Sequence, residues 1–285
     1  MRKLQDQWNA VTESRWCLLA VVFVVVSAAP AFCQDDLSHS PAKTHDVSSE
    51  WQVEATVIRV LTPHDIRPDR RYRVLYVLPV ESRLTTRWGD SITETIKHDL
   101  HNKHQLICVF PTFADLPWYA DHPTDRQLRQ ETYLLREVVP LIEAEYPART
   151  DVSGRLLVGF SKSGWGAWSL LLRNPQFFGR AAAFDAPMMM DAPGKYGSGP
   201  IFGTPENFFN YQVSRQLKLR ASELKQTRPR LALFGKGNFQ DDHERVAELL
   251  QILQIPHHQD DSTEREHSWH SGWLPNAVHW LAGAQ

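Results

Sequence analysis

The sequence predicts an α/β fold with a mostly parallel central sheet and helices on both faces. Short, nearly continuous apolar segments alternate along the chain with longer segments of helical periodicity. Strands that are apolar on both sides belong inside a helix-covered sheet, and the strand–helix alternation favours parallel connections. With 285 residues, of which 42% are hydrophobic and 22% charged, the chain can build a large core.

Three strands are predicted in the first part of the chain. Gln52–Leu61 alternates polar and β-branched residues, as a half-buried strand does. Residues 73–80 (RVLYVLPV) and 105–111 (QLICVFP) are almost wholly apolar, which indicates buried strands, and a helix is expected between them over 91–101. The loop over 112–123 then lies beyond the carboxyl end of a strand, where open α/β sheets bind ligands.

The second part of the chain continues the alternation. A helix is predicted over 124–146, and residues 155–187 follow as a strand, a sharp turn, a helix and a second strand. Residues 188–228, rich in Gly, Pro and aromatic side chains, are expected to lie beside the site as a candidate lid. The last predicted elements are a strand over 229–234, a helix over about 242–253, a short strand near 257–259 and a closing helix from Pro275.

The turn between the strand and helix of 155–187 carries the strongest chemical motif. Its sequence, Gly159-Phe160-Ser161-Lys162-Ser163-Gly164, approximates the nucleophile elbow, with Ser163 where glycine is usual. A serine held in such strained backbone needs small neighbours. The following helix directs its first free amides at the serine, so the Lys162 amide is a candidate donor to an oxyanion.

A catalytic Ser161 needs a base within hydrogen-bond reach and a carboxylate that orients the base. In proteins with this type of elbow, the acid and then the histidine follow the serine along the chain. His267 lies in a loop after the last strand, where the base is expected, and His270 is a second candidate. The sequence therefore favours His267 as the general base.

The acid has three candidates. Asp242 is ranked first because it follows the strand of 229–234 and adjoins the next helix, although it and Asp241 could simply cap that helix. Asp185, at the end of the strand that follows the nucleophile helix, is the alternative, and Asp241 is ranked third. The sequence leaves this choice open.

Further site residues are assigned by position. The second oxyanion donor is expected from the loop after Val80, at the amide of Glu81 or Ser82. Substrate contacts are predicted for four aromatic residues, with core packing as an equal interpretation of the tryptophans. These residues are Trp118, Tyr119, Trp165 and Trp269, and Trp273 is a further candidate.

No metal or cofactor is expected. His98, His101 and His104 recur every three residues, but they straddle a predicted helix end and no carboxylate or cysteine cluster accompanies them. The formal net charge of −2 provides no broad basic surface for nucleic acid or anionic lipid. A small-molecule or carbohydrate substrate fits this charge better, and the oligomeric state is not predicted.

The amino terminus resembles a secretory signal peptide. Within residues 1–33, basic residues precede an apolar run from Cys17 to Val26, and Ala29-Pro30-Ala31 is a candidate cleavage site, with cleavage after Cys33 as an alternative. The run is too short to span a bilayer comfortably. We therefore expect a secreted or periplasmic protein without a stable membrane span. Residues 34–50 are expected to be a flexible linker, which leaves 51–285 as the catalytic domain.

Together these features resemble the putative-esterase (esterase D-like) family of α/β-hydrolases, which includes feruloyl and other carbohydrate esterases, S-formylglutathione hydrolases and mycolyltransferases. The matching segments are RVLYVLP, VFPTFADLPWYAD, EVVPLIEAEYPARTD, LLVGFSKSGWGAWSLLLRNPQFFGRAAAFDAP and HSWHSGW. The resemblance covers roughly residues 51–283 and implies an α/β-hydrolase fold, Ser161 as nucleophile, His267 as base and the Lys162 amide in the oxyanion hole.

Three positions depart from the family pattern. Pro79-Val80 replaces the His-Gly pair that is usual after the first core strand, and Ser163 replaces the elbow glycine. Where the family tends to place its acid, shortly after the penultimate strand, this chain has Gly237-Asn238. The resemblance thus leaves the acid to Asp242 or Asp185.

These observations predict an exported serine hydrolase that cleaves carboxylic esters, including acyl groups on carbohydrate, through an acyl-enzyme. Two other functions are consistent with the same residues. One is an acyltransferase that uses an alcohol in place of water. The other is a non-catalytic binding domain that kept the fold, because fold alone does not fix function.

Overall fold

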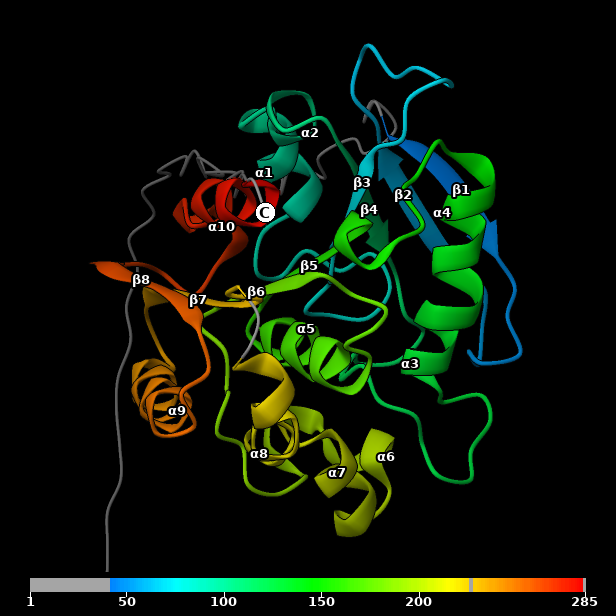
Figure 1. The fold of residues 1–285 in the computed structure, drawn as a ribbon. Coiled ribbons are helices and arrows are strands. Elements are labelled where there is room, and N and C mark those ends of the chain that lie inside the picture. Colours follow the sequence, from blue (N-terminus) through cyan, green and yellow to red (C-terminus); the bar gives the residue numbers. More distant parts are fainter. Residues whose placement is uncertain (1–41, 226–227, 284–285) are drawn as a thin grey trace, which may run out of the picture. The chain divides into compact units, whose positions relative to one another are not determined.

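An eight-stranded sheet forms the centre of the described structure, which comprises residues 42–225 and 228–283 of a computed structural model (Figure 1). The strands, with their bounds, are β1 (Lys43–Val47), β2 (Thr56–Leu61), β3 (Arg73–Val77), β4 (Leu106–Pro111), β5 (Arg155–Phe160), β6 (Arg180–Phe184), β7 (Leu231–Lys236) and β8 (His257–Glu264). Their order is β1-β2-β4-β3-β5-β6-β7-β8. From β4 to β8 all neighbours are parallel, whereas β1 pairs with β2, and β2 with β4, in antiparallel fashion. The predicted mostly parallel sheet is confirmed.

The edge strand β1 corrects the predicted linker. Residues 43–47 were assigned to a flexible segment because they are polar, yet Lys43 to Val47 pair in register with Val60 to Thr56 of β2. Polar side chains are compatible with an edge strand, because one of its edges and much of its surface face water. The predicted signal peptide, residues 1–33, lies outside the described residues, as do residues 34–41 of the predicted linker.

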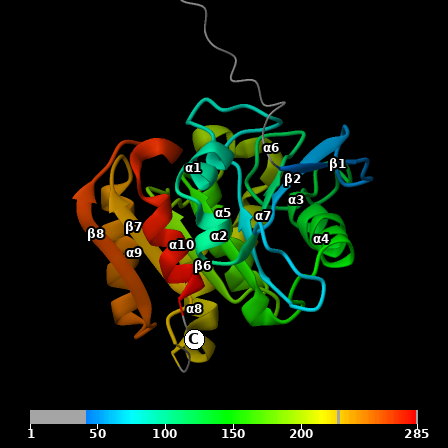
Figure 2. The same cartoon turned by 90° about the horizontal axis from the view of Figure 1, so that it is seen from above.

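One face of the sheet is covered by three helices. They are α1 (Ser91–Lys97), α2 (Leu100–Lys103) and α10 (Leu274–Ala282). Their apolar side chains, among them Ile92 and Leu274, form one core cluster with alternate residues of the central strands. Figure 2 views the molecule from this side, with these helices in front of the sheet.

The opposite face is covered by the remaining helices. Those against the sheet are α3 (Gln130–Tyr133), α4 (Val139–Glu145), α5 (Lys162–Arg173), α8 (Val213–Leu224) and α9 (Gln240–Ile252), with α6 (Gly199–Phe202) and α7 (Pro205–Tyr211) beside them (Figure 1). Buried side chains from both layers form the second and larger core cluster. The sheet is therefore covered on both faces, as predicted.

Several boundaries differ from the predictions. The helix expected over 124–146 begins only at Gln130, and Leu134–Val138 within it is a π-helical segment. The helix expected over 91–101 is broken at Asp99, whose φ of 54° lies in the left-handed region. Among the described residues, no helix has the length and apolar character needed to cross a membrane.

Residues 188–225 of the candidate lid are packed into the domain through α6–α8. Phe202 and Phe208 lie against Trp165 of α5, with ring centroids 5.9 and 6.4 Å from it. Nearer the elbow, Tyr196 packs edge-on against Phe239, at 5.4 Å between centroids. The candidate lid is thus anchored on the nucleophile helix.

Candidate active site

The turn between β5 and α5 holds Ser161 in strained backbone. Its φ of 54° and ψ of −129° are rarely adopted by a residue with a side chain. A β-carbon at Gly159 would lie 2.1 Å from the carbonyl oxygen of Ser163, so only glycine fits there. The Ser161 amide donates to the Phe184 carbonyl of β6 over 3.0 Å, which fixes the turn to the neighbouring strand. This geometry is that of the predicted nucleophile elbow.

Ser161, His267 and Asp185 form a continuous chain of side-chain contacts. The Ser161 hydroxyl lies 3.2 Å from His267 Nε2, and His267 Nδ1 lies 2.5 Å from Asp185 Oδ2. The side chains of His267 and Asp185 are 10% and 0% exposed. Since an ionised carboxylate only accepts hydrogen bonds, His267 Nδ1 carries the proton and donates a hydrogen bond to Asp185, and Nε2 presents a lone pair to the serine. The arrangement can remove the proton of Ser161.

The Asp185 carboxylate is stabilised in its charged form. Burial alone raises its pKa, but the His267 contact and the amides of Phe239 and Asn238 lower it, with a net pKa below the ordinary value. The two amides donate over 2.7 and 3.0 Å. A β-carbon at Gly237 would lie 2.5 Å from Asp185 Oδ2, so the turn after β7 needs glycine to receive the carboxylate. Asp185 is therefore ionised and fixed opposite His267.

The first-ranked acid, Asp242, is not in contact with His267. Its carboxylate accepts the Met189 amide over 3.0 Å and lies 3.9 Å from Arg245 in the first turns of α9. Asp241, the third candidate, is exposed on the same helix. The helix begins at Gln240, so its first-turn carboxylates stabilise its amino-terminal end and the neighbouring chain. The structure thus corrects the choice from Asp242 to Asp185.

Three aromatic rings enclose His267, and the sequence analysis assigned none of them to the site. Its ring centroid lies 4.4 Å from Phe160, 5.1 Å from Trp88 and 5.7 Å from Phe239. Phe160 directly precedes the nucleophile in the sequence, and this adjacency was the signal that could have placed it in the site. The rings restrict rotation of the imidazole and exclude water from one side of its contact with Asp185.

Both predicted oxyanion donors lie in segments that are joined by an ion pair. Lys162 begins α5, so its amide has no acceptor within the helix. Its Nζ lies 3.2 Å from Oε1 of Glu81, and the same oxygen accepts from Trp88 Nε1 over 3.1 Å. The Glu81 side chain therefore holds the loop after β3 against the elbow. The Glu81 amide as second oxyanion donor stays a prediction.

Tyr119 provides a second link between this loop and the elbow. Its hydroxyl donates to the Pro79 carbonyl over 2.5 Å, and its ring lies where a β-carbon at Gly166 would be only 2.0 Å away. Burial raises the pKa of Tyr119, an effect that the nearby Ser163 hydroxyl opposes. Ser163, in turn, accepts from the Phe160 amide and donates to the Phe160 carbonyl, both over 2.9 Å. The unusual elbow serine thus cross-links the turn from inside.

The predicted substrate contacts are mostly wrong. Trp118, Tyr119 and Trp165 are all 1% exposed or less, and they pack in the core behind the elbow. Their positions at a strand end and on the nucleophile helix fit either interpretation, and core packing is the correct one. Trp269 is also buried, but it lines a small cavity beside the site, while Trp273 stacks on Phe184 at 4.8 Å.

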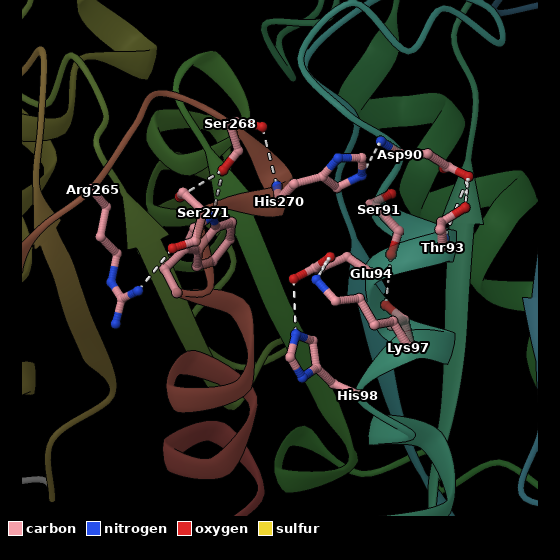
Figure 3. A network of polar contacts seen from close by, with 12 residues as sticks. Asp90, Ser91, Thr93, Glu94, Lys97, His98, Arg265, Ser268, His270 and Ser271 are labelled. Atoms are coloured by element: carbon pink, nitrogen blue, oxygen red, sulfur yellow. Dashed lines mark hydrogen bonds and ion pairs between the residues drawn. The ribbon is translucent and has the colours of Figure 1, made fainter. Parts of the chain in front are cut away.

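The loop that carries His267 is fastened to the loop before α1 (Figure 3). The Trp88 carbonyl accepts from the Trp269 amide over 2.9 Å and from the Ser268 hydroxyl over 3.2 Å. His270, the second candidate base, has no contact with Ser161; its Nε2 accepts the Asp90 amide over 3.0 Å, as Figure 3 shows. His270 therefore holds the two loops together.

The three histidines at spacing three have separate surroundings. His98 pairs with Glu94, His101 lies beside Asn102, and His104 packs against His279. Within residues 42–225 and 228–283, no group of three or more His, Cys, Asp or Glu side chains is arranged to hold a metal ion.

The fold and the Ser161–His267–Asp185 chain define the class of an α/β-hydrolase with a serine nucleophile. The chain belongs to the family described as "Putative esterase", whose model matches residues 49–276. It is accordingly a serine carboxylic-ester hydrolase, and the expected family is confirmed. No curated protein matches the chain in sequence.

Solved structures share the fold at low sequence identity. Fluorophosphonate-binding serine hydrolase F of Staphylococcus aureus has a TM-score of 0.70 at 18% identity, over 85% of this chain and 98% of its own. A ferulic acid esterase has a TM-score of 0.67 at 18% identity, over 85% and 96%. The S-formylglutathione hydrolase of Agrobacterium tumefaciens has a TM-score of 0.67 at 16% identity, over 85% and 94%.

A buried histidine behind the acid generates a pH prediction. His243 Nε2 accepts the Ala186 amide over 2.9 Å, and burial lowers the pKa of His243 from 6.5 to about 4, opposed by the charge of Asp185. The unfolded chain binds this proton below about pH 6.5 and the folded chain only below about 4. The stabilisation that comes from a neutral His243 is therefore fully present above pH 6.5. About 3 kcal/mol of the unfolding free energy is lost as the pH falls from 6.5 to 4.

The comparison of wild type with His243→Gln isolates this contribution. Glutamine can still accept the Ala186 amide but does not titrate, so urea unfolding between pH 7 and 4 should show a flatter pH dependence in the variant. Equal slopes for the two proteins would contradict the assignment of a neutral buried His243.

Proposed function

We propose that this protein is an exported esterase that uses Ser161, His267 and Asp185 as a catalytic triad. His267 Nε2 takes the hydroxyl proton as Ser161 Oγ attacks the ester carbonyl. The tetrahedral oxyanion is held by the amides of Lys162 and Glu81. His267 then gives the proton to the departing alcohol, which leaves an acyl group on Ser161. Water, activated by His267, then attacks that acyl group. The bond between the acyl carbon and Ser161 Oγ breaks, the carboxylic acid leaves, and His267 returns the proton to Oγ.

One observation carries this proposal: the buried, ionised Asp185 is 2.5 Å from His267 Nδ1, while Nε2 faces Ser161 Oγ at 3.2 Å. A chain that only kept the fold would have no need of the strained φ of Ser161 or of the buried Asp185 charge, both of which cost stability. The complete hydrogen-bonded chain therefore favours catalysis over the binding-domain alternative. Within the ester class we propose acyl groups on carbohydrate, on the strength of the family resemblance.

The nucleophile can be tested with a fluorophosphonate probe and a small p-nitrophenyl ester. Wild type should be labelled stoichiometrically, and Ser161→Ala should lose labelling and roughly 10⁶-fold in kcat. Full ester hydrolysis by Ser161→Ala would exclude the mechanism.

Export makes a separate prediction. Protein recovered from the producing cells should begin at residue 32 or 34, because export removes the leader. An intact leader on the recovered protein would exclude export.

The two acid candidates predict opposite results. Asp185→Asn should lower kcat by about 10³- to 10⁴-fold, because the amide no longer stabilises the imidazolium or its tautomer. Asp242→Asn is the matched control: its side-chain oxygen can still accept the Met189 amide, so kcat should stay within about 3-fold of wild type. A large loss in Asp242→Asn with an active Asp185→Asn would reverse the assignment.

The Tyr119 contact predicts a selective loss of turnover. Tyr119→Phe removes the hydrogen bond to Pro79, so the oxyanion loop is held less tightly and kcat should fall about 10-fold, less than the loss of a whole donor. KM should change less than about 2-fold, because the interaction strengthens only in the transition state.

Tyr133→Phe is the control for a general effect of losing a buried hydroxyl. The Tyr133 hydroxyl binds Thr56 Oγ1 over 2.6 Å, at the start of β2. Steady-state kinetics of both variants should show a lower kcat for Tyr119→Phe alone. An equal fall in the two, or a change confined to KM, would mean that Tyr119 does not position the oxyanion loop.

A further inference from the structure

A small cavity lies under the loop over 79–91, next to the site. Its volume is about 40 Å³, and its lining includes Arg59 of β2 and the hydroxyl residues Thr85, Thr86, Ser91 and Thr112. A water molecule needs at least about 10–15 Å³ of such volume, so the cavity has room for about three non-hydrogen atoms. This size suits a carboxylate group and excludes a sugar ring.

The cavity is lined by a cationic group, Arg59, that forms no ion pair within residues 42–225 and 228–283. Arg59 Nε is shielded from solvent and has no hydrogen-bond partner in the part of the chain that the structure describes. Burial lowers the pKa of Arg59, and the charge of Asp90 opposes this shift. Arg59 as a whole is half-buried, so the shielded Nε–H is the donor that lacks a partner. A guanidinium presents donors in a planar fork that matches a carboxylate, and a shielded donor without a partner is costly. The group is therefore arranged to receive an anion.

Both carboxylates that line the cavity are engaged elsewhere. Asp90 caps α1, where it accepts from the amides of Ile92 and Thr93 over 3.1 and 3.4 Å. Glu81 accepts from Lys162 and Trp88. Neither carboxylate is hydrogen-bonded to Arg59, so the shielded Nε–H remains available to a ligand.

A second residue of the lining carries a hydroxyl donor. Thr112 Oγ1 accepts the Val57 amide over 2.8 Å, which leaves its hydroxyl hydrogen free to donate. By contrast, the other arginine of the lining, Arg83, is paired at 2.6 Å with Glu54 on the surface. Arg59 and Thr112 thus offer donors to one small anion, whereas Arg83 is already neutralised.

The cavity shares its wall with the active site. Glu81 and Trp88 line it, and the same two residues contact Lys162 and His267. A carboxylate bound at Arg59 would therefore lie directly behind the loop that is proposed to supply an oxyanion donor. The position connects the cavity to ester cleavage rather than to an unrelated surface.

We propose that this cavity is a carboxylate subsite, centred on Arg59, of the esterase. The inference rests on the proposed function and adds a substrate class to it: esters that carry an additional carboxylate, acidic carbohydrate esters among them. The carboxylate comes either from the substrate itself or from a separate small carboxylic acid that binds beside it. The experiment below distinguishes these two sources.

The first arm compares two esters that differ in charge and little in shape. Monomethyl succinate carries a carboxylate where methyl 4-methylpentanoate carries an isopropyl group. Wild type should prefer the half-ester in kcat/KM, and Arg59→Gln should reduce that preference by about 10- to 100-fold, the value of a charge-assisted hydrogen bond. The readout is the ratio of the two kcat/KM values, so an effect of Arg59→Gln that lowers both esters equally does not support the subsite. Arg59→Lys, which keeps the charge, should restore part of the preference.

The second arm measures binding of a free carboxylate. At constant ionic strength, sodium acetate should raise the Tm of wild type and not that of Arg59→Gln if the cavity takes a separate acid. Arg83→Gln is the matched control in both arms and should behave as wild type. Circular dichroism of each variant verifies folding, and Arg59→Met, which keeps an unbranched side chain but removes the charge, replaces Arg59→Gln if the latter does not fold.

The outcomes separate the hypotheses. A charge preference that depends on Arg59 supports the substrate as source, and an acetate effect that depends on Arg59 without that preference supports a separate acid. If Arg59→Gln changes neither, or Arg83→Gln changes both equally, the subsite is wrong. Loss of the proposed function would appear differently, as wild type that hydrolyses neither ester while acetate still raises its Tm.

Discussion

The contact between Asp185 and His267 is the interaction on which the rest of the site depends. It joins the end of β6 to a loop that begins 80 residues later, and it requires a charge to be buried. The amides of Asn238 and Phe239 supply the compensating hydrogen bonds, and the turn after β7 supplies them only because Gly237 leaves room. Parallel order brings these strand ends together at the carboxyl edge of the sheet.

This contact also explains a departure from the family pattern. The acid expected shortly after the penultimate strand is replaced by Gly237-Asn238, and that turn now receives the carboxylate that β6 presents. The acid has changed strand while its place opposite His267 is kept. His243 completes the support from behind, because its neutral ring accepts the Ala186 amide next to Asp185. The acid at the end of β6 and the Gly237-Asn238 turn after β7 are therefore parts of one hydrogen-bonded arrangement.

The sequence was sufficient for features that depend on local chemistry. The apolar strands predicted the sheet, and the small residues around Ser161 predicted the elbow, because backbone strain restricts which residues fit. The sequence did not determine which aspartate is the acid. Asp185 at a strand end and Asp242 at a helix start are both plausible, and only the three-dimensional position of the turn after β7 distinguishes them. The roles of Trp118 and Tyr119 were missed for a similar reason: an aromatic after a strand can face the cleft or the core.

The role of Ser163 in the elbow can be explained from the structure but not from the sequence. In the sequence it is a glycine replaced by a slightly larger residue, which sterics allow but do not explain. In the structure its hydroxyl bonds both backbone groups of Phe160 and lies beside Tyr119, whose own hydroxyl reaches Pro79. Where the family has a His-Gly pair in the loop after the first core strand, this chain has Pro79-Val80. The carbonyl of Pro79 accepts a hydrogen bond from the buried Tyr119. The two substitutions therefore belong together, because the hydroxyl gained in the elbow and the altered oxyanion loop meet at one tyrosine.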